Sequence, residues 1–333
     1  MKFVRFLTFI LVVGIVLIAL PASLKVAVVA GDAIGDRGFT DMAYFGIQKA
    51  AKDFNIKYKI FECHVNPAKY FDALKAAAQY YDLIFVDPGY FFDKELKEIV
   101  KMYPNKTFVY IDGITNLPGV ISVPFKQNEG AFLAGALAAL LTAKTSLKLI
   151  NPEKIVGFVG GADMPVIRDY QVGFEQGVKY IDPEVKVVVK YAGTHYDPAK
   201  GKETAFAVYK EGADVIFQAA GPTGLGVLEA AKDYKFYAIG VDIDQGYLQP
   251  GYIVSSMLKR VDVAVYDIVK KAIEGTLEKG KIYTYGVKNG GIGLVYNEYT
   301  MDIIPASVYL EMKKIEKDMM EGKIIVKSYF EGK

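Results

Sequence analysis

The sequence predicts an α/β protein built from two doubly wound parallel-sheet lobes, with a ligand cleft between them. Short β-rich runs alternate with helical patterns along most of the chain. The strand runs lack inside/outside alternation, which is typical of parallel sheets covered on both faces. The alternation of strand and helix patterns stops and restarts near the middle of the chain, and 333 residues are enough for about two domains.

The first lobe is expected to begin with the apolar, β-branched run Lys25–Ala30. A Gly- and Asp-rich turn follows at residues 31–38, and helical spacing then runs from Phe39 to Phe54. The same β-then-α rhythm continues to Ile111. The further expected strands are residues 57–62, 83–86 and 107–111, and the helices are residues 67–81 and 93–102.

The second lobe is expected to begin with an apolar helix at residues 129–141. Its Gly130, Gly135 and several alanines predict close packing against another element. A Lys-, Asn- and Pro-containing break follows at residues 144–152. The expected strands are residues 155–159, 185–191, 215–218 and 237–241, and the helices are residues 166–180, 198–211 and 223–234. Helices at residues 262–278 and 306–320 close the chain.

No Ser- or Pro-rich linker separates the two units, so we expect short hinge segments instead. The expected crossings are residues 120–125, 254–259 and a segment near 286–294. Lobe 1 is then predicted to contain residues 24–125 plus 254–285. Lobe 2 is predicted to contain residues 126–253 plus 286–333.

Residues 1–23 have the pattern of a secretory signal. Lys2 and Arg5 precede an uncharged apolar run at residues 6–20, and Pro21-Ala22-Ser23 ends it. An uncleaved membrane anchor is the alternative, because the run is only slightly shorter than a bilayer span; a buried helix is a weaker one. Either of the first two interpretations places the body of the protein outside the cytoplasm. No cysteine follows the run to carry a lipid.

The composition argues against several classes of partner. There are 40 Lys and Arg and 38 Asp and Glu, without long charged runs, so nucleic acid is not an expected partner. The only cysteine is Cys63 and the only histidines are His64 and His195. We therefore expect no intramolecular disulfide, no metal site and no cofactor.

Polar residues gather where five of the predicted strands end. These segments combine Gly with Asp, Gln or an aromatic residue: residues 31–39, 86–89, 111–113, 217–226 and 240–245. Such turns occur in many α/β proteins, but five at one edge predict a ligand site, because ligands bind at the carboxyl ends of parallel strands. Carboxylates there accept hydrogen bonds from hydroxyl or ring N–H groups.

Catalytic motifs are poorly represented, so no catalytic residue is predicted and the protein is not expected to be an enzyme. Residues 221–226 read G-x-x-G-x-G without the Lys-Ser/Thr of a phosphate loop, and residues 31–38 lack the dinucleotide pattern. Asp112, Asp242 and Asp244 could form an acid–base pair for glycosidic cleavage. Hydroxyl recognition needs the same side chains, so an enzyme that cleaves a glycosidic bond is the less favoured interpretation.

Several long stretches of the chain together resemble one family. They are residues 35–50, 131–139, 156–178, 212–232, 239–245 and 255–267. They are similar to the basic membrane protein family, the nucleoside-binding components of ABC importers, which includes the purine nucleoside receptor of spirochaetes. The resemblance extends from about residue 25 to the C-terminus. It implies a type I periplasmic-binding-protein fold, an extracytoplasmic location, a permease partner and a nucleoside ligand, by that analogy a purine nucleoside. A receptor of the same fold that signals to a membrane partner is the alternative, and a nucleoside-cleaving enzyme is the least favoured one.

The resemblance also implies roles for seven residues. Phe39 and Phe217 would stack on the two faces of the base. Asp32 and Asp112 would form hydrogen bonds with the base or its surroundings. Gly221, Asp242 and Lys259 would contact the ribose. Two departures stand out: Arg37-Gly38-Phe39-Thr40 replaces the usual Lys-Ser-Phe-Asn, and the lipoprotein cysteine is absent.

Overall fold

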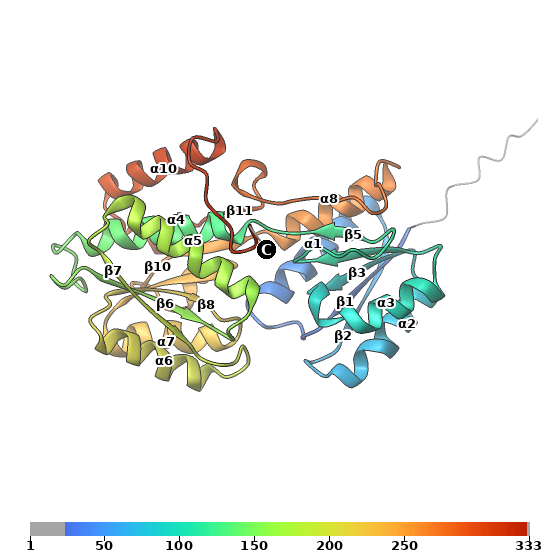
Figure 1. Cartoon of the computed structure of the whole chain (residues 1–333), viewed down its shortest axis with the longest axis horizontal. Helices are drawn as coiled ribbons and strands as arrows, with labels where there is room; N and C mark the ends of the chain where they lie inside the picture. The colour runs from blue at the N-terminus through green and yellow to red at the C-terminus, as the bar shows by residue number, and fades with distance from the viewer. Residues whose placement is uncertain (1–23, 332–333) are drawn as a thin grey trace, which may run out of the picture.

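The first lobe is built on a five-stranded parallel sheet with the order β2-β1-β3-β4-β5. The computed structural model describes residues 24–331 (Figure 1). The strands are β1 (Lys25–Ala30), β2 (Lys57–Glu62), β3 (Leu83–Asp87), β4 (Thr107–Ile111) and β5 (Ile121–Val123). The helices of this lobe are α1 (Phe39–Phe54), α2 (Tyr70–Tyr80), α3 (Asp93–Met102) and α8 (Val261–Ile273).

Strand β1 shows why the strand sequences are continuously apolar. Val26 and Val28 pack in a core with residues of α1 and α8, whereas Ala27 and Val29 pack in a second core with residues of α2 and α3. Both faces of the sheet are therefore covered by helices, and each face needs apolar side chains. The carboxyl edge of the sheet remains free to form a site.

The second lobe is built on a six-stranded sheet with the order β11-β10-β9-β8-β6-β7. Only β11 is antiparallel to its neighbour. Its strands are β6 (Ile155–Gly160), β7 (Lys186–Tyr191), β8 (Val215–Ala219), β9 (Tyr237–Asp242), β10 (Ile253–Lys259) and β11 (Ile292–Leu294). Its helices are α4 (Gln127–Thr142), α5 (Pro165–Ile181), α6 (Pro198–Lys210), α7 (Thr223–Tyr234), α9 (Glu298–Met301) and α10 (Ala306–Met320).

Helices α4 and α5 cover one face of this sheet, and their backbones are in direct contact. A Cβ atom at Gly135 would lie 2.1 Å from the carbonyl oxygen of Phe174, and one at Gly177 would lie 1.9 Å from that of Phe132. These distances exclude any side chain, so glycine is required on both helices. The close packing expected from the small residues of α4 is present. Helices α6 and α7 cover the opposite face.

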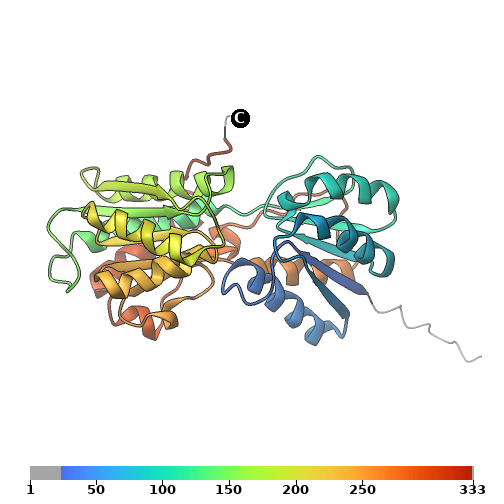
Figure 2. The same ribbon diagram turned by 90° about the horizontal axis from the view of Figure 1, so that it is seen from below.

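Three segments cross between the lobes and lie side by side (Figure 2). Residues 122–126 and 281–285 exchange backbone hydrogen bonds, among them Lys126 N to Tyr285 O at 2.8 Å. The second crossing is at Arg260, whose N–H donates to the carbonyl of Gly291 at 2.9 Å. Two of the three hinge segments are therefore paired through backbone hydrogen bonds.

The sequence-based lobe boundary at residue 254 is wrong for one element. Strand β10 pairs with β9 in the second sheet, so residues 254–259 belong to lobe 2 and the chain changes lobe at Arg260. Residues 286–294, expected as the third crossing, contain β11 and likewise belong to the second sheet. Helix α8 does pack on α1 of lobe 1.

After α10 the chain returns across the second lobe. The side chain of Asn128 on α4 donates to the carbonyl of Val326, and Asp169 on α5 accepts from Ser328 Oγ and Tyr329 N, both at 2.7 Å. Within residues 24–331, no helix combines the length and the apolar character needed to cross a membrane. The predicted signal or anchor, residues 1–23, lies outside the described residues.

Candidate ligand-binding site

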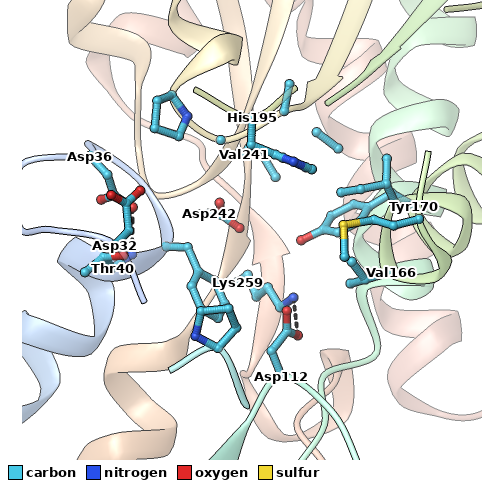
Figure 3. A pocket seen from close by; sticks show the side chains of 18 of the residues that line it. Asp32, Asp36, Thr40, Asp112, Val166, Tyr170, His195, Val241, Asp242 and Lys259 are labelled. Atoms are coloured by element: carbon cyan, nitrogen blue, oxygen red, sulfur yellow. Dashed lines mark hydrogen bonds and ion pairs between the residues drawn. The ribbon is translucent and has the colours of Figure 1, made fainter. Parts of the chain in front are cut away.

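A pocket lies between the lobes where the carboxyl ends of both sheets meet (Figure 3). It encloses about 700 Å³ of space, including its opening to solvent. Six of the seven predicted site residues line it, three from each lobe: Asp32, Phe39, Asp112, Gly221, Asp242 and Lys259. Residues far apart in the sequence thus converge as the strand-end pattern predicts.

The loop between β1 and α1 forms the lobe 1 wall and is held by two carboxylates. Asp36 accepts hydrogen bonds from the backbone N–H groups of residues 38, 40 and 41, at 2.8 to 3.1 Å. Asp41 accepts from those of Gly35 and Arg37, at 2.7 and 3.0 Å. These bonds satisfy N–H groups at the start of α1, so Phe39 enters the pocket from a fixed position.

Asp112 and Asp242 occupy equivalent positions in the two lobes. Asp112 directly follows β4 with φ of 68°, and Asp242 ends β9 with φ of 69°. Non-glycine residues adopt this left-handed conformation at a cost, and such strain clusters at functional sites. Both carboxylates are buried, and both face the space between the lobes (Figure 3).

Lys259 is the last residue of β10 and lies at the centre of the pocket. It forms an ion pair with Asp112 of the other lobe, and the two side chains are 2% and 5% exposed. Its Nζ lies 5.2 Å from the centre of the Phe39 ring and 5.5 Å from that of Tyr170, close enough for cation–π attraction. The lysine therefore joins charge and aromatic surface from both lobes.

Burial sets the protonation of the pocket carboxylates. It raises the pKa of Asp242 to about 7, an effect that Lys259 opposes and that Asp36 and Asp112 strengthen. Burial also raises the pKa of Asp112, again opposed by Lys259, and raises the pKa of the half-buried Asp32. Asp242 is therefore able to donate or accept a hydrogen bond near neutral pH.

The prediction that Phe217 lies in the cleft is wrong. Phe217 is fully buried, and its ring packs 5.6 Å from that of Phe174 and 5.8 Å from that of Phe158. It is not among the residues that line the pocket. The reason is side-chain alternation along β8, which directs Phe217 toward α5.

Sequence reasoning missed the aromatic residues that lobe 2 presents to the pocket, among them His195. His195, in the loop between β7 and α6, lines the pocket together with Tyr196. Its carbonyl accepts from Thr223 N at 2.9 Å, and its ring lies against Gly161, where a Cβ atom would be 2.4 Å away. Burial lowers the pKa of His195, which favours the neutral ring. Residues 192–197 form a strand-end loop of the same kind as those that indicated the other walls.

Tyr90, Phe91 and Tyr170 also line the pocket, so aromatic rings contribute from several sides. Asp244, the third carboxylate considered for glycosidic cleavage, does not line it; it accepts hydrogen bonds from the side chain of Asn297 and the N–H of Gly246. Among residues 24–331, no group of three or more His, Cys, Asp and Glu side chains is placed to hold a metal ion.

The fold and the pocket together define a two-lobed solute-binding protein with a pocket between its lobes. The chain belongs to the Bmp family of PnrA-like ABC transporter substrate-binding proteins, whose family model matches residues 23–329. Substrate-binding proteins of this family are extracytoplasmic, and the family implies a small-molecule ligand and permease partners.

Individual relatives agree with this assignment. The chain is 34% identical to the ABC transporter nucleoside-binding protein BmpA of Lactococcus lactis, over 92% of this chain and 89% of that protein. It is 33% identical to basic membrane protein D of Borreliella burgdorferi, over 90% and 87%. The crystal structure of an ABC transporter solute-binding protein of Aeropyrum pernix is 28% identical and superposes with a TM-score of 0.81, covering 91% of this chain and 94% of that one.

Proposed function

We propose that the pocket binds a nucleoside with a purine base and that the closed, loaded protein delivers it to an ABC permease. The observation that carries this proposal is the make-up of the pocket. Both lobes contribute aromatic faces and carboxylates around a single lysine. A nucleoside needs this combination, since it joins a flat ring to a hydroxyl-bearing sugar.

Phe39 and His195 are the proposed stacking pair for the base. They line the pocket from opposite lobes, so a flat ring between them would be held only when the lobes close. Tyr170 is less suited to this role because it is buried and its ring packs 6.3 Å from that of Phe217. Stacking on an aromatic side chain contributes about 1–3 kcal/mol per base in nucleic-acid complexes.

The carboxylates and Lys259 are the proposed partners of the polar edges. Asp32 near Phe39 is suited to accept from base N–H groups, and Asp242 and Lys259 are suited to the ribose hydroxyls. A ligand without the matching groups would leave buried polar atoms unpaired, which is costly. This supports selection of a nucleoside over a free base or free ribose.

Residues 1–23 are the proposed export signal or membrane tether. In either form they would place the body of the protein outside the cytoplasm, where a permease receives its substrate. Protease added to intact cells should then digest the protein, and protection until lysis would contradict this placement.

Binding is tested first by identifying the small molecule that co-purifies with the protein, using mass spectrometry after denaturation. Isothermal titration with adenosine, guanosine, inosine, cytidine, adenine and ribose follows. Purine nucleosides should bind more tightly than cytidine, adenine or ribose. Ribose binding as tight as nucleoside binding would contradict the proposal, and release of free base from inosine during incubation would instead indicate an enzyme.

The stacking pair is tested by two substitutions at one position. His195→Phe keeps an aromatic face and should retain nucleoside affinity. His195→Ala removes the face and should weaken binding by about 1–3 kcal/mol. Equal affinities for the two variants would exclude His195 as a stacking residue.

A further inference from the structure

We infer that Gln245 is a positioning residue that ties two walls of the lobe 2 pocket to the β1–α1 loop of lobe 1 and thereby stabilises the closed conformation. Gln245 does not line the pocket, and it is 2% exposed. The inference concerns how the pocket closes. It rests on the proposed function only in using a nucleoside as one of its probes.

The side-chain amide of Gln245 makes three hydrogen bonds. Its Oε1 accepts from Val241 N at 3.0 Å and from Gln218 Nε2 at 3.1 Å. Because two donors face Oε1, the NH₂ group must be the one directed at the carbonyl oxygen of Arg37, 3.0 Å away. Arg37 belongs to lobe 1, so this last bond joins the two lobes.

Gln218 extends the same network to a second wall. It is fully buried, and its Oε1 accepts from Ala220 N at 3.1 Å. Ala220 and Val241 both line the pocket, at the ends of β8 and β9. The two glutamines therefore fix both strand-end turns, and Gln245 alone carries the connection to the opposite lobe.

The surrounding backbone leaves space for these two amides. A Cβ atom at Gly240 would lie 2.5 Å from Gln245 Oε1, and one at Gly224 would lie 2.0 Å from Gln218 Oε1. The N–H of Gln245 donates to Ser256 Oγ at 3.0 Å. The network is thus enclosed on several sides, and a buried amide with unmade bonds is costly.

The lobe 1 end of the connection is equally fixed. Arg37 has φ of 51°, and its N–H donates to Asp41, which also holds Gly35. The carbonyl that Gln245 bonds therefore moves with the loop that carries Asp36 and Phe39, both pocket residues. Opening the lobes separates Gln245 from Arg37, so this bond stabilises the closed state and not the open one.

The matched variants are Gln245→Glu and Gln48→Glu. Each replaces an amide NH₂ group by a carboxylate oxygen, but Gln48 is exposed on α1 and donates within that helix, to the hydroxyl of Tyr44 at 2.6 Å. Only Gln245→Glu loses the donor that crosses between the lobes. With adenosine as probe, Gln245→Glu should raise the dissociation rate by about two- to tenfold at pH 8, the scale of one net hydrogen bond. Gln48→Glu should leave it nearly unchanged.

The pH dependence of the dissociation rate provides a second test of Gln245→Glu. A purely structural defect in this variant would not be reversed by lowering the pH. Lowering the pH should protonate the buried carboxyl that Gln245→Glu introduces and so restore a donor. The dissociation rate of this variant should then return toward that of the wild type measured at the same pH. Equal dissociation rates for the two variants, or no recovery at low pH, would overturn the inference.

A ligand-free measurement separates this inference from the proposed function. Spin labels on cysteines introduced at exposed Gln79 and Glu203 report the distance between α2 and α6, while Cys63 is buried. Gln245→Glu should shift the distances toward longer values at pH 8, and Gln48→Glu should not. If no nucleoside binds the wild type, the proposed function fails and this comparison still decides the role of Gln245; the same distribution in both variants rejects it.

Discussion

Lys259 of the second lobe and Asp112 of the first form a buried ion pair that joins the lobes at the pocket. Each partner compensates the other's lost hydration, and removing one leaves an uncompensated charge. The pair should therefore contribute both to the stability of the protein and to the closure of the pocket.

Lys259→Met should destabilise the protein by about 3–5 kcal/mol and weaken ligand binding, because Asp112 is left buried without its cation. Chemical denaturation and titration calorimetry measure the two effects. The double variant Asp112→Leu with Lys259→Met should recover part of the stability but not the binding. Lys49→Met, which breaks the exposed pair with Asp53, is the control and should leave stability nearly unchanged.

The raised pKa of Asp242 predicts a pH-dependent stability. Its pKa is about 7 in the folded protein against 3.8 as the reference value, so the folded state holds more protons than the unfolded state between about pH 4 and pH 7. The free energy of unfolding contributed by this group is therefore highest below pH 4 and falls as the pH rises to 7.

Asp242→Asn removes this titration. Denaturation of the ligand-free proteins from pH 4 to pH 8 should show a steeper fall in the wild type than in the variant, with the difference complete near pH 7. The other pocket carboxylates titrate in both proteins and largely cancel. Parallel profiles would contradict the assigned pKa of Asp242.

Phe39 and Phe217 should respond in opposite ways to truncation. Phe217→Ala should cost about 3–5 kcal/mol of stability, as for other core phenylalanines, while the folded fraction keeps its affinity. Phe39→Ala should cost about 1–3 kcal/mol of binding with a smaller loss of stability. Phe45→Ala, at an exposed position on α1, is the control. If Phe217→Ala lost binding without losing stability, Phe217 would have to contact the ligand, which would contradict its assignment to the core.

The charge of the pocket predicts rejection of nucleotides. Four aspartates line it, Asp32, Asp36, Asp112 and Asp242, and the only lysine there is already paired; no arginine of residues 24–331 lines it. Adenosine 5′-monophosphate should bind on the order of a hundredfold more weakly than adenosine, because its phosphate meets buried negative charge. Asp32→Asn should narrow this difference, and equal affinities for the two ligands in the wild type would contradict the charge argument.

The elements that the sequence predicted well are those with long apolar runs. Lys25–Ala30 and Thr107–Ile111 are strands with the predicted bounds, because both faces of each sheet are covered. Strands β5 and β11 span three residues each, too few to show a period. In β10, Ser255 and Ser256 interrupt the apolar pattern; they are buried because Ser255 Oγ donates to Val295 O and Ser256 Oγ accepts from Gln245 N.

The site was predictable where it depends on strand ends and not where it depends on tertiary contacts. Asp112, Asp242 and Lys259 converge because each lies at or just after the end of a strand. The strand-end argument failed for Phe217, whose side chain points to α5, whereas the next residue, Gln218, lies against α7. The place of His195 depends on Gly161, just after β6, and on Thr223, the first residue of α7.

The glycine contacts between α4 and α5 limit how this protein is able to change its ligand during evolution. Helix α5 carries Val166, Ile167 and Tyr170 into the pocket, and it cannot move away from α4 without opening a gap, nor closer, because the backbones already touch. Descendants of this sequence should therefore acquire new ligand preferences through the β1–α1 and β7–α6 loops, where side-chain size is free to vary, while the α5 wall keeps its distance from α4.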